Sequence, residues 1–149
     1  MKLVLVNPVN PNMTGFTVRT KGRFPPLGLG IVAAMTPDDW DIEIIDENIA
    51  PFAFKDADLV GLTAFTASVR RAYDIARIYR EKGIHTVIGG IHASMMPEEA
   101  AQHVDTVVAG EAEGVWCDVI ADFEAGRIKK HYNGSLPDLT NVPVPRRDL

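Results

Sequence analysis

Short, continuous runs of apolar residues that alternate with helical patterns constrain the fold of this chain more than any other feature. Such runs, rich in β-branched residues, are typical of strands that are buried on both faces of a parallel sheet. Five of them occur along the chain, at Leu3–Val6, Ile42–Asp46, Leu59–Thr63, Thr86–Gly90 and Thr106–Gly110. The alternation therefore predicts an α/β fold built on a doubly wound parallel sheet.

The segments between these runs carry helix signals. Residues 67–82 place apolar side chains at a period of about 3.6 residues, and Gly83 follows where a glycine commonly ends a helix. Further helices are predicted at Gly28–Met35, from Pro97 and at Glu113–Glu124. We expect a flavodoxin-like (Rossmann-like) five-stranded sheet of order 2-1-3-4-5. Right-handed crossovers then bring every loop that follows a strand to one edge, where ligands bind in such sheets.

Composition limits the class of protein further. The 149 residues fit one domain, and 15 basic against 20 acidic side chains give a net charge of −5. This balance argues against nucleic-acid binding, which depends on clustered positive charge. No apolar stretch reaches the roughly 18 residues of a membrane helix, and no signal peptide is recognisable. With a single cysteine, Cys117, we expect a cytoplasmic protein without a disulfide or a membrane partner, in which Cys117 is a buried structural thiol.

Two segments depart from compact α/β design. Residues 8–27 form a proline-rich connection much longer than the usual length of about 2–6 residues, which indicates either function or disorder. Residues 127–149 contain Pro137, Pro143 and Pro145 and are typical of an extended tail that leaves the domain. We therefore predict a domain at 1–126 and a tail at 127–149.

The loops argue against two other functions of this fold class. A phosphotransfer receiver needs acids after the first strand, an aspartate ending the third and a lysine ending the fifth, where this chain has Asn7, Thr63 and Gly110. Residues 28–33, GLGIVA, match the dinucleotide pattern G-x-G-x-x-A, but about 20 residues separate them from the first strand. Because the pattern binds pyrophosphate only directly after that strand, glycines that allow close helix packing are the simpler interpretation.

Small and hydroxyl side chains gather in three loops that this topology brings to the same edge. The candidates are Thr63, Ala64, Phe65, Thr66 and Ser68 after the third strand, Gly89, Gly90 and His92 after the fourth, and Gly110 and Glu111 after the fifth. Each loop has a local explanation: helix capping by Thr66 or Ser68, a tight turn at the two glycines, and acids that complement a helix dipole. Together the loops predict a slot that suits a long, nucleotide-like group.

On these residues the chain resembles cobalamin-binding domains. Gly61–Ser94 is similar to the segment of cobalamin-dependent methionine synthases in which a hydroxyl-rich loop, a helix and a Gly-Gly strand end surround the dimethylbenzimidazole tail. The resemblance implies tail contacts at Thr63, Ala64, Thr66, Ser68, Gly89 and Gly90. That family also carries Asp-x-His-x-x-Gly after the first strand, whose histidine binds cobalt, but residues 7–24 of this chain contain no histidine.

A closer resemblance covers nearly the whole chain. The segments FPPLGLG from Phe24, IGGIHA from Ile88, AGEAE from Ala109 and NVPVPRRDL from Asn141 occur in this order. This is similar to the N-terminal domain of cobalamin-dependent radical S-adenosylmethionine enzymes. The resemblance implies that the tail leads to a radical S-adenosylmethionine domain, absent from this chain, whose Cys-x-x-x-Cys-x-x-Cys motif binds a [4Fe–4S] cluster. It also implies that the larger enzyme performs methyl transfer or other radical chemistry.

The missing histidine implies base-off cobalt above the long loop. Asn10, Asn12, Thr14, Arg19 or water would lie below cobalt, and His92, Gly110 and Glu111 are further expected cofactor contacts. Arg19, Lys21 and Arg23 form a basic group that is either solvated or paired with the absent domain or a cofactor phosphate. Two alternatives remain open: a cobalamin-type fold that has lost its cofactor and acts in positioning or interaction, and a flavin- or nucleotide-binding flavodoxin-like domain.

Overall fold

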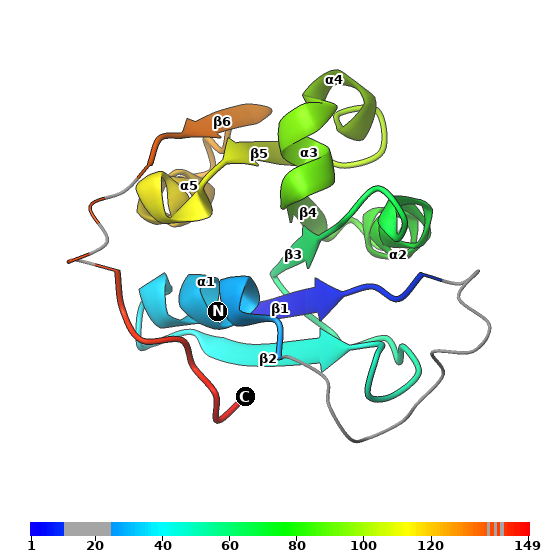
Figure 1. Ribbon diagram of the computed structural model, residues 1–149, viewed down its shortest axis with the longest axis horizontal. Helices are drawn as coiled ribbons and strands as arrows, with labels where there is room; N and C mark the ends of the chain where they lie inside the picture. Colours follow the sequence, from blue (N-terminus) through cyan, green and yellow to red (C-terminus); the bar gives the residue numbers. More distant parts are fainter. Residues whose placement is uncertain (11–24, 137, 139, 141) are drawn as a thin grey trace.

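A computed structural model describes residues 1–10, 25–136, 138, 140 and 142–149. Within these residues, six strands form one parallel sheet of order β2-β1-β3-β4-β5-β6 (Figure 1). The strands are β1 (Lys2–Asn7), β2 (Asp41–Asp46), β3 (Leu59–Thr63), β4 (His85–Gly89), β5 (Thr106–Gly110) and β6 (His131–Gly134). The α/β class, the parallel pairing and the order of the first five strands are confirmed.

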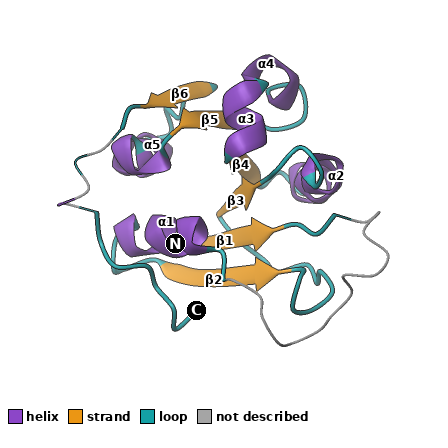
Figure 2. Ribbon diagram, viewed as in Figure 1, coloured by secondary structure: helices purple, strands orange, loops and turns teal. Residues whose placement is uncertain are grey.

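Helices cover both faces of this sheet, as a doubly wound fold requires (Figure 2). They are α1 (Leu27–Met35), α2 (Val69–Arg80), α3 (Ile91–Met95), α4 (Pro97–Ala100) and α5 (Trp116–Glu124), with a short 3-10 turn, η1 (Ala112–Gly114), before α5. Helices α1 and α5 lie on one face, and α2, α3 and α4 lie on the other. No described helix is both long and apolar enough to cross a lipid bilayer.

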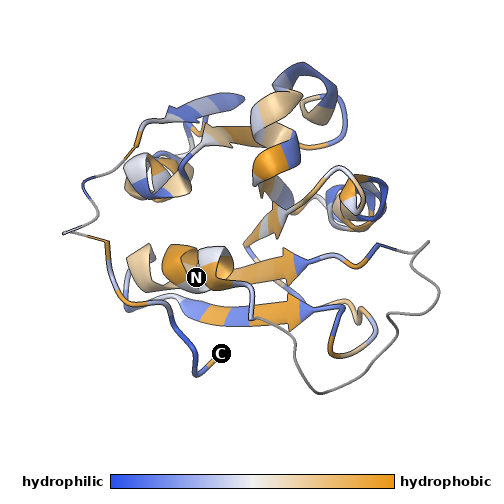
Figure 3. Ribbon diagram, in the orientation of Figure 1, coloured by the Kyte–Doolittle hydropathy of each residue, from blue (hydrophilic) through white to orange (hydrophobic). Residues whose placement is uncertain are grey.

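Alternate residues of the strands β1 to β5 enter two separate cores, because side chains along a strand point to opposite faces. Val60, Ile88 and Val107 belong to the core under α2, α3 and α4. Val87 and Val108, their neighbours in β4 and β5, belong to the core under α1 and α5. Strand β1 and helix α1 are among the most apolar segments of the chain (Figure 3). The central strands were identified in the sequence by their continuous apolar runs.

The sheet contains one strand more than the sequence predicts. β6 lies inside the segment 127–149 that the prolines mark as an extended tail, and it pairs with β5 in the register Val108↔Tyr132. Tyr132 is buried, and its hydroxyl donates to Asp122 Oδ2 at 2.9 Å. The strand His-Tyr-Asn-Gly has no apolar run. A sequence pattern could not find it, because one tyrosine and pairing with β5 hold it in place.

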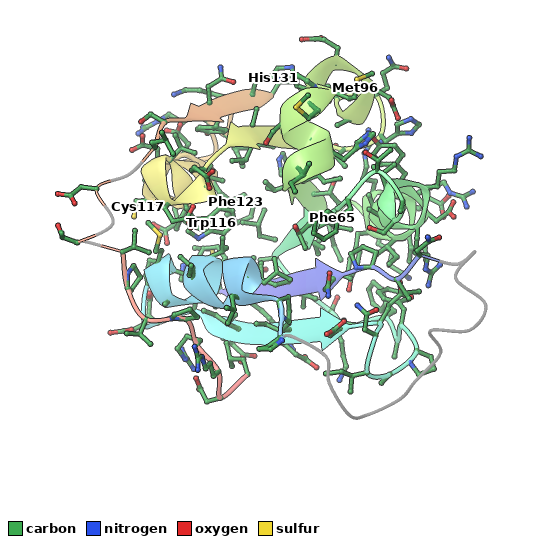
Figure 4. All side chains as sticks on the ribbon, in the orientation of Figure 1. Phe65, Met96, Trp116, Cys117, Phe123 and His131 are labelled. Atoms are coloured by element: carbon green, nitrogen blue, oxygen red, sulfur yellow. The ribbon has the colours of Figure 1, made fainter. Side chains whose placement is uncertain are left out.

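Two local expectations need correction. The sequence predicts the next helix after the strand Thr86–Gly90 only from Pro97, but α3 already begins at Ile91. Cys117 is exposed, so the expectation of a buried thiol is wrong. On α5 the adjacent Trp116 occupies the buried position between α5 and α1, which turns Cys117 toward solvent (Figure 4).

Candidate functional site

The loops that follow β3, β4 and β5 form one connected rim at the carboxyl edge of the sheet. The backbone amide of Ala64 donates to the carbonyl of Gly89 at 3.3 Å, which joins the first two loops. Ser94 Oγ donates to the carbonyl of Gly90 at 3.0 Å and accepts from the amide of Gly110 at 2.9 Å, which joins the second and third. The expected meeting of the three loops is therefore present.

Two glycines of this rim adopt backbone conformations that other residues rarely take. Gly90 has φ of 91° and Gly110 has φ of 78°. A Cβ atom on Gly90 would lie 2.7 Å from Thr63 Oγ1, and one on Gly110 would overlap the carbonyl oxygen of Gly134. Neither position accepts a side chain, so no side chain projects from the backbone at the ends of strands β4 and β5.

A cavity of about 170 Å³ opens below the rim on the face covered by α1 and α5. Its floor follows from the strand register, in which Gly61 lies between Leu5 of β1 and Val87 of β4. Gly89 is two residues beyond Val87 in β4, so it faces the same side. Gly89 leaves space where a buried parallel strand normally carries a large apolar side chain, whereas Cδ2 of Leu5 occupies the place of a side chain at Gly61.

Trp116 forms the wall opposite this floor, and only 3% of its surface is exposed. Its indole Nε1 donates to Thr36 Oγ1 at 2.9 Å, and Thr36 Oγ1 donates to the carbonyl of Val32 at 2.8 Å. A Cβ atom on Gly61 would lie 4.0 Å from Cη2 of the indole. The hydrogen-bonded chain between α1 and α5 therefore fixes the indole close to the backbone of Gly61.

The cavity is apolar inside and acidic at its mouth. Leu29, Val32 and Val108 contribute to its walls, and Glu111 and Glu113 line it where β5 passes into η1. Among the described residues, the buried side-chain nitrogen and oxygen atoms without a hydrogen-bond partner are Tyr79 Oη and His92 Nε2, outside this cavity. The described residues also contain no cluster of three or more metal-binding side chains. The site is therefore suited to binding a flat apolar group.

Five of the residues that sequence reasoning selected line this cavity. They are Thr63, Gly89, Gly90, Gly110 and Glu111. Sequence reasoning omitted Gly61, Trp116 and the α1 residues Leu29 and Val32. The sequence could have identified Gly61, because a residue two positions before Thr63 in a strand faces the same side of the sheet as Thr63. No sequence pattern identifies Trp116 or α1 as part of the site, because only tertiary packing brings them over the strands.

The remaining candidates after β3 lie outside the cavity. Ala64 is buried in the core under α2, whereas Phe65 is 62% exposed. Ser68 is the N-cap residue of α2, but its hydroxyl bonds to the backbone of Phe65 and makes no capping bond, so side-chain capping by Ser68 is wrong. Thr66 Oγ1 lies 3.2 Å from Nδ1 of His92. Contacts of these residues with a cofactor stay predictions.

His92 is 4% exposed and sits between the loop after β3 and helix α4. Its Nε2 lies 3.6 Å from Oε1 of Glu99, whose same oxygen is 3.4 Å from the hydroxyl of Tyr73. These contacts join α2, α3 and α4 below the rim. Burial, followed by the charge of and hydrogen bond to Glu99, raises the pKa of Tyr73 to about 12.

The start of the long loop after β1 is anchored beside the same edge. The amide of Val9 donates to Glu47 Oε2 at 3.1 Å, and Arg71 Nη2 lies 2.6 Å from Glu47 Oε1. The hydrogen bond to the buried Glu47 raises the pKa of Arg71. Asn10 follows this anchor directly. The other loop candidates lie outside the described residues; they are Asn12, Thr14, Arg19, Lys21 and Arg23.

A larger cavity of about 420 Å³ lies between α1, the edge strand β2 and residues 145–149. The amide of Arg146 donates to the carbonyl of Gly30 at 3.0 Å, and a Cβ atom on Gly30 would lie 3.1 Å from Cβ of Pro145. Gly30 of the GLGIVA segment thus permits close packing, as the simpler interpretation predicts. Ligands of doubly wound sheets bind where the strand order reverses, here between β1 and β3, which favours the smaller cavity.

Comparisons with known proteins agree with this geometry. Residues 13–120 match the family model described as the B12 binding domain. The chain is 38% identical to bacteriochlorophyllide d C-8(2)-methyltransferase of Chlorobaculum tepidum over 72% of its own length and 24% of that protein. It is 32% identical over its whole length to an uncharacterized methyltransferase of Pyrococcus horikoshii, covering 39% of it.

A third relative is hopanoid C-2 methylase of Rhodopseudomonas palustris, which is 31% identical over 84% of this chain and 25% of that protein. The chain thus spans between about a quarter and two fifths of the length of these three curated relatives. Their names describe enzymes that transfer methyl groups.

Proposed function

The chain belongs to the B12-binding domain family, and we propose that it holds a cobalamin whose nucleotide tail enters the cavity beneath α1 and α5. One observation carries this proposal: Gly61 and Gly89, which lack side chains, and the buried indole of Trp116 line one cavity, which borders the point between β1 and β3 where the strand order reverses. The backbone at Gly89 and the indole of Trp116 give a flat aromatic base surfaces to pack against.

The size of the cavity supports the entry of the nucleotide tail without the corrin ring. Its 170 Å³ is below the range of roughly 300–1,000 Å³ that is typical of sites for whole drug-sized ligands. It is close to the volume of about 150 Å³ of an engineered apolar cavity that binds benzene. The cavity therefore accepts one aromatic base, and the corrin ring would stay outside, over the rim of the three loops.

The protein's own residues would bind and orient the cofactor. Gly90 and Gly110 keep the rim low, and Glu111 and Glu113 offer acceptors to amide groups at the mouth of the cavity. Residues 7–24 contain no histidine, and His92 is buried under the rim. We therefore infer that cobalt is base-off and takes no histidine of this chain as its lower ligand. Cobalamin, when bound, supplies the organometallic chemistry, and the protein supplies orientation and electrostatics.

A titration of the chain with hydroxocobalamin, followed by absorbance, tests the proposal. Saturable binding with a base-off spectrum is the expected result, and the cob(II) form should give an electron paramagnetic resonance signal without nitrogen splitting from a protein histidine. Cobinamide, which has the same corrin but no nucleotide tail, should bind at least tenfold more weakly. Equal affinity for cobinamide and cobalamin would overturn tail insertion into the cavity.

The same titration separates the two alternatives. A chain that stays colourless at saturating cobalamin is a positioning or interaction module that has lost its cofactor. Stabilisation by flavin mononucleotide and not by cobalamin, in a thermal shift experiment, would favour a flavodoxin-like function, because a ligand stabilises the state that it binds.

We further propose that the domain, whose sheet extends to β6, acts in a larger methyltransferase-type enzyme. The support is the methyltransferase relatives, which are much longer than this chain, and the motif resemblance to cobalamin-dependent radical S-adenosylmethionine enzymes. In this proposal the segment after β6 leads to a domain that binds a [4Fe–4S] cluster and S-adenosylmethionine. A natural reading frame that carries no three-cysteine cluster motif after the NVPVPRRDL segment would contradict it.

A further inference from the structure

We propose that residues 145–149, here called the strap, hold helix α1 in the position in which it walls the smaller cavity. Gly30 is the positioning residue, because the strap meets the helix there. This inference rests on the proposed function, since the cavity that α1 walls is the one proposed to take the tail of the cofactor. It concerns the side of α1 that faces the larger cavity.

Helix α1 has few features that fix its position by themselves. It is nine residues long, and isolated helices shorter than about 12–15 residues are marginally stable in water. Its sequence, LGLGIVAAM, contains no charged residue, and no side chain caps its first turn. The place of α1 over the sheet therefore depends on how other segments pack against it.

Helix α1 is a wall shared by two cavities. Leu29 and Val32 line the smaller cavity, whereas Leu27 and Gly30 line the larger one. Because successive residues of a helix are turned by about 100°, these two pairs lie on opposite sides of α1. A shift of α1 toward the larger cavity would therefore widen the smaller one and loosen its fit to a ligand.

The strap contacts α1 on the side of the larger cavity, and Figure 1 shows it in red beside α1 and β2. The amide of Arg146 donates to the carbonyl of Gly30 at 3.0 Å. A Cβ atom on Gly30 would lie 3.1 Å from Cβ of Pro145 and 3.2 Å from the carbonyl oxygen of Arg146. A side chain at position 30 would push the strap outward, so the glycine permits this close approach.

The sequence limits the conformations of the strap and of the residues that lead into it. Pro143 and Pro145 fix their own φ angles, and each restricts the residue before it to extended conformations. A segment with few accessible conformations loses little entropy when it docks. The strap therefore needs few contacts to stay on α1.

The docking of the strap is also open to release. A cavity of about 420 Å³ remains between the strap, α1 and β2, so these segments do not form a closed core. If only molecules with α1 in place have the smaller cavity formed, the apparent affinity for a ligand falls with the fraction of such molecules. By linkage, a ligand in the smaller cavity must favour the docked strap to the same degree.

The first experiment measures this linkage. Trypsin cleaves after Arg146 and Arg147, which are exposed in the strap. Saturating cobalamin should slow cleavage at these two bonds by roughly threefold or more, followed by mass spectrometry of the chain, because docking withdraws the strap from the protease. A free peptide NVPVPRRDL, cleaved in the same solutions, controls for an effect of cobalamin on trypsin itself.

Two results of this experiment would overturn the strap. One is an unchanged rate of cleavage in a chain that is saturated with cobalamin. The other is equal slowing after Arg127, which is exposed and lies outside the strap, because this would show general stabilisation of the fold. Either result would leave the proposed function intact.

A pair of variants at one position tests the hydrogen bond to α1. Arg146→Pro removes the amide N–H that donates to Gly30, whereas Arg146→Ala removes the side chain and keeps that N–H. Arg146→Pro should weaken cobalamin binding by roughly three- to tenfold, the effect of one lost hydrogen bond, measured by absorbance titration. Arg146→Ala should bind as the unmodified chain does. Equal affinities of the two variants would show that the amide does not hold the helix.

A further variant, Gly30→Ala, separates positioning from stability. Alanine favours a helix more than glycine does, so the variant should leave the free energy of unfolding in urea unchanged or higher. Its methyl group displaces the strap, so cobalamin should bind roughly threefold more weakly or worse, and trypsin should cleave the strap faster. Unchanged affinity, or a loss of affinity together with a lower free energy of unfolding, would overturn the positioning role of Gly30.

The failure of this proposal is distinguishable from the failure of the proposed function. An unmodified chain that binds no cobalamin rejects the proposed function, and the strap with it. A chain that binds cobalamin with the same affinity in every variant, and whose strap is cleaved at the same rate with and without the cofactor, keeps the proposed function and rejects the strap.

Discussion

The two faces of the sheet use the same strands in different ways. Under α2, α3 and α4, the strand residues are large, and helix residues such as Ile75 and Tyr79 close over them completely. Under α1 and α5, the corresponding positions include Gly61 and Gly89, and a cavity remains. The first face therefore contributes stability through close packing. The second face contributes less stability from packing, because part of it is left open as a binding site.

This contrast also separates two kinds of glycine. Gly90 and Gly110 are required by their backbone conformation and by the atoms that surround them at the rim. Gly61 lies in a regular strand and is required by the space on one face, where an added Cβ would lie 2.7 Å from Cδ2 of Leu5. The lesson is that a doubly wound sheet can create a site on one face without disturbing the core on the other, since neighbouring residues never share a face.

The largest effect is expected from a truncation on the filled face. Ile88 is fully buried there, so Ile88→Ala should lower the free energy of unfolding by about 2–5 kcal/mol. Urea denaturation measures the change. The control is Ile91→Ala, because Ile91 is 60% exposed and its loss should cost less than about 0.5 kcal/mol. Similar costs for the two variants would contradict the close packing of this face.

The second prediction concerns the support of the cavity wall. Thr36→Val removes the acceptor of the Trp116 indole and should lower the free energy of unfolding by about 1–3 kcal/mol, because a buried N–H is left unpaired. It should also weaken cobalamin binding, since the wall is no longer held in one orientation. Thr36→Ser keeps the hydroxyl and should restore both properties. A Thr36→Val chain with unchanged stability and affinity would mean that this hydrogen bond does not hold the wall.

The third prediction fills the cavity. Ala112 lines it from η1, so Ala112→Leu should weaken cobalamin binding by at least roughly tenfold, or about 1.4 kcal/mol, while the free energy of unfolding stays the same or rises. Absorbance titration and urea denaturation give the two numbers. Ala121→Leu adds the same side chain to an exposed position of α5 and should change neither. Unchanged affinity of Ala112→Leu would place the tail elsewhere.

The smallest effect concerns the part of the pH dependence of stability that Tyr73 contributes on the filled face. The pKa of Tyr73 is raised to about 12 by burial and by the Glu99 carboxylate, above the value of about 10 in an unfolded chain. The stability contributed by the neutral phenol is therefore fully present below pH of about 10 and is lost as pH rises through about 12. In urea denaturation between these values, Tyr73→Phe should lose less stability than the unmodified chain. Parallel losses in the two proteins would show that Tyr73 is not the group that titrates.

Much of the fold could be predicted from local pattern. The apolar runs of β1, β3, β4 and β5 are continuous because both faces of these strands are buried, and that property is visible in the sequence. β6 was not predictable, since its four residues include only one buried side chain, Tyr132. Its position depends on pairing with β5 and on the hydrogen bond to Asp122, which are contacts between distant segments.

The candidate site was only half predictable for the same reason. Topology alone placed Thr63, Gly89 and Gly110 at one edge of the sheet, because parallel strands with right-handed crossovers leave no other arrangement. It could not show that Thr66 bonds to His92 or that Phe65 turns to solvent, since these orientations depend on packing against α3 and α4.

The amino-acid sequence by itself determined the order of the first five strands and the edge at which ligands would meet the protein, through apolar runs, crossover handedness and the placement of glycines. Only the tertiary structure decided on which face of that edge the cavity opens. Trp116 and Thr36 are 80 residues apart, and their contact closes one side of the cavity. A contact of this range has no local signature in the sequence, because it depends on how two helices pack across a sheet.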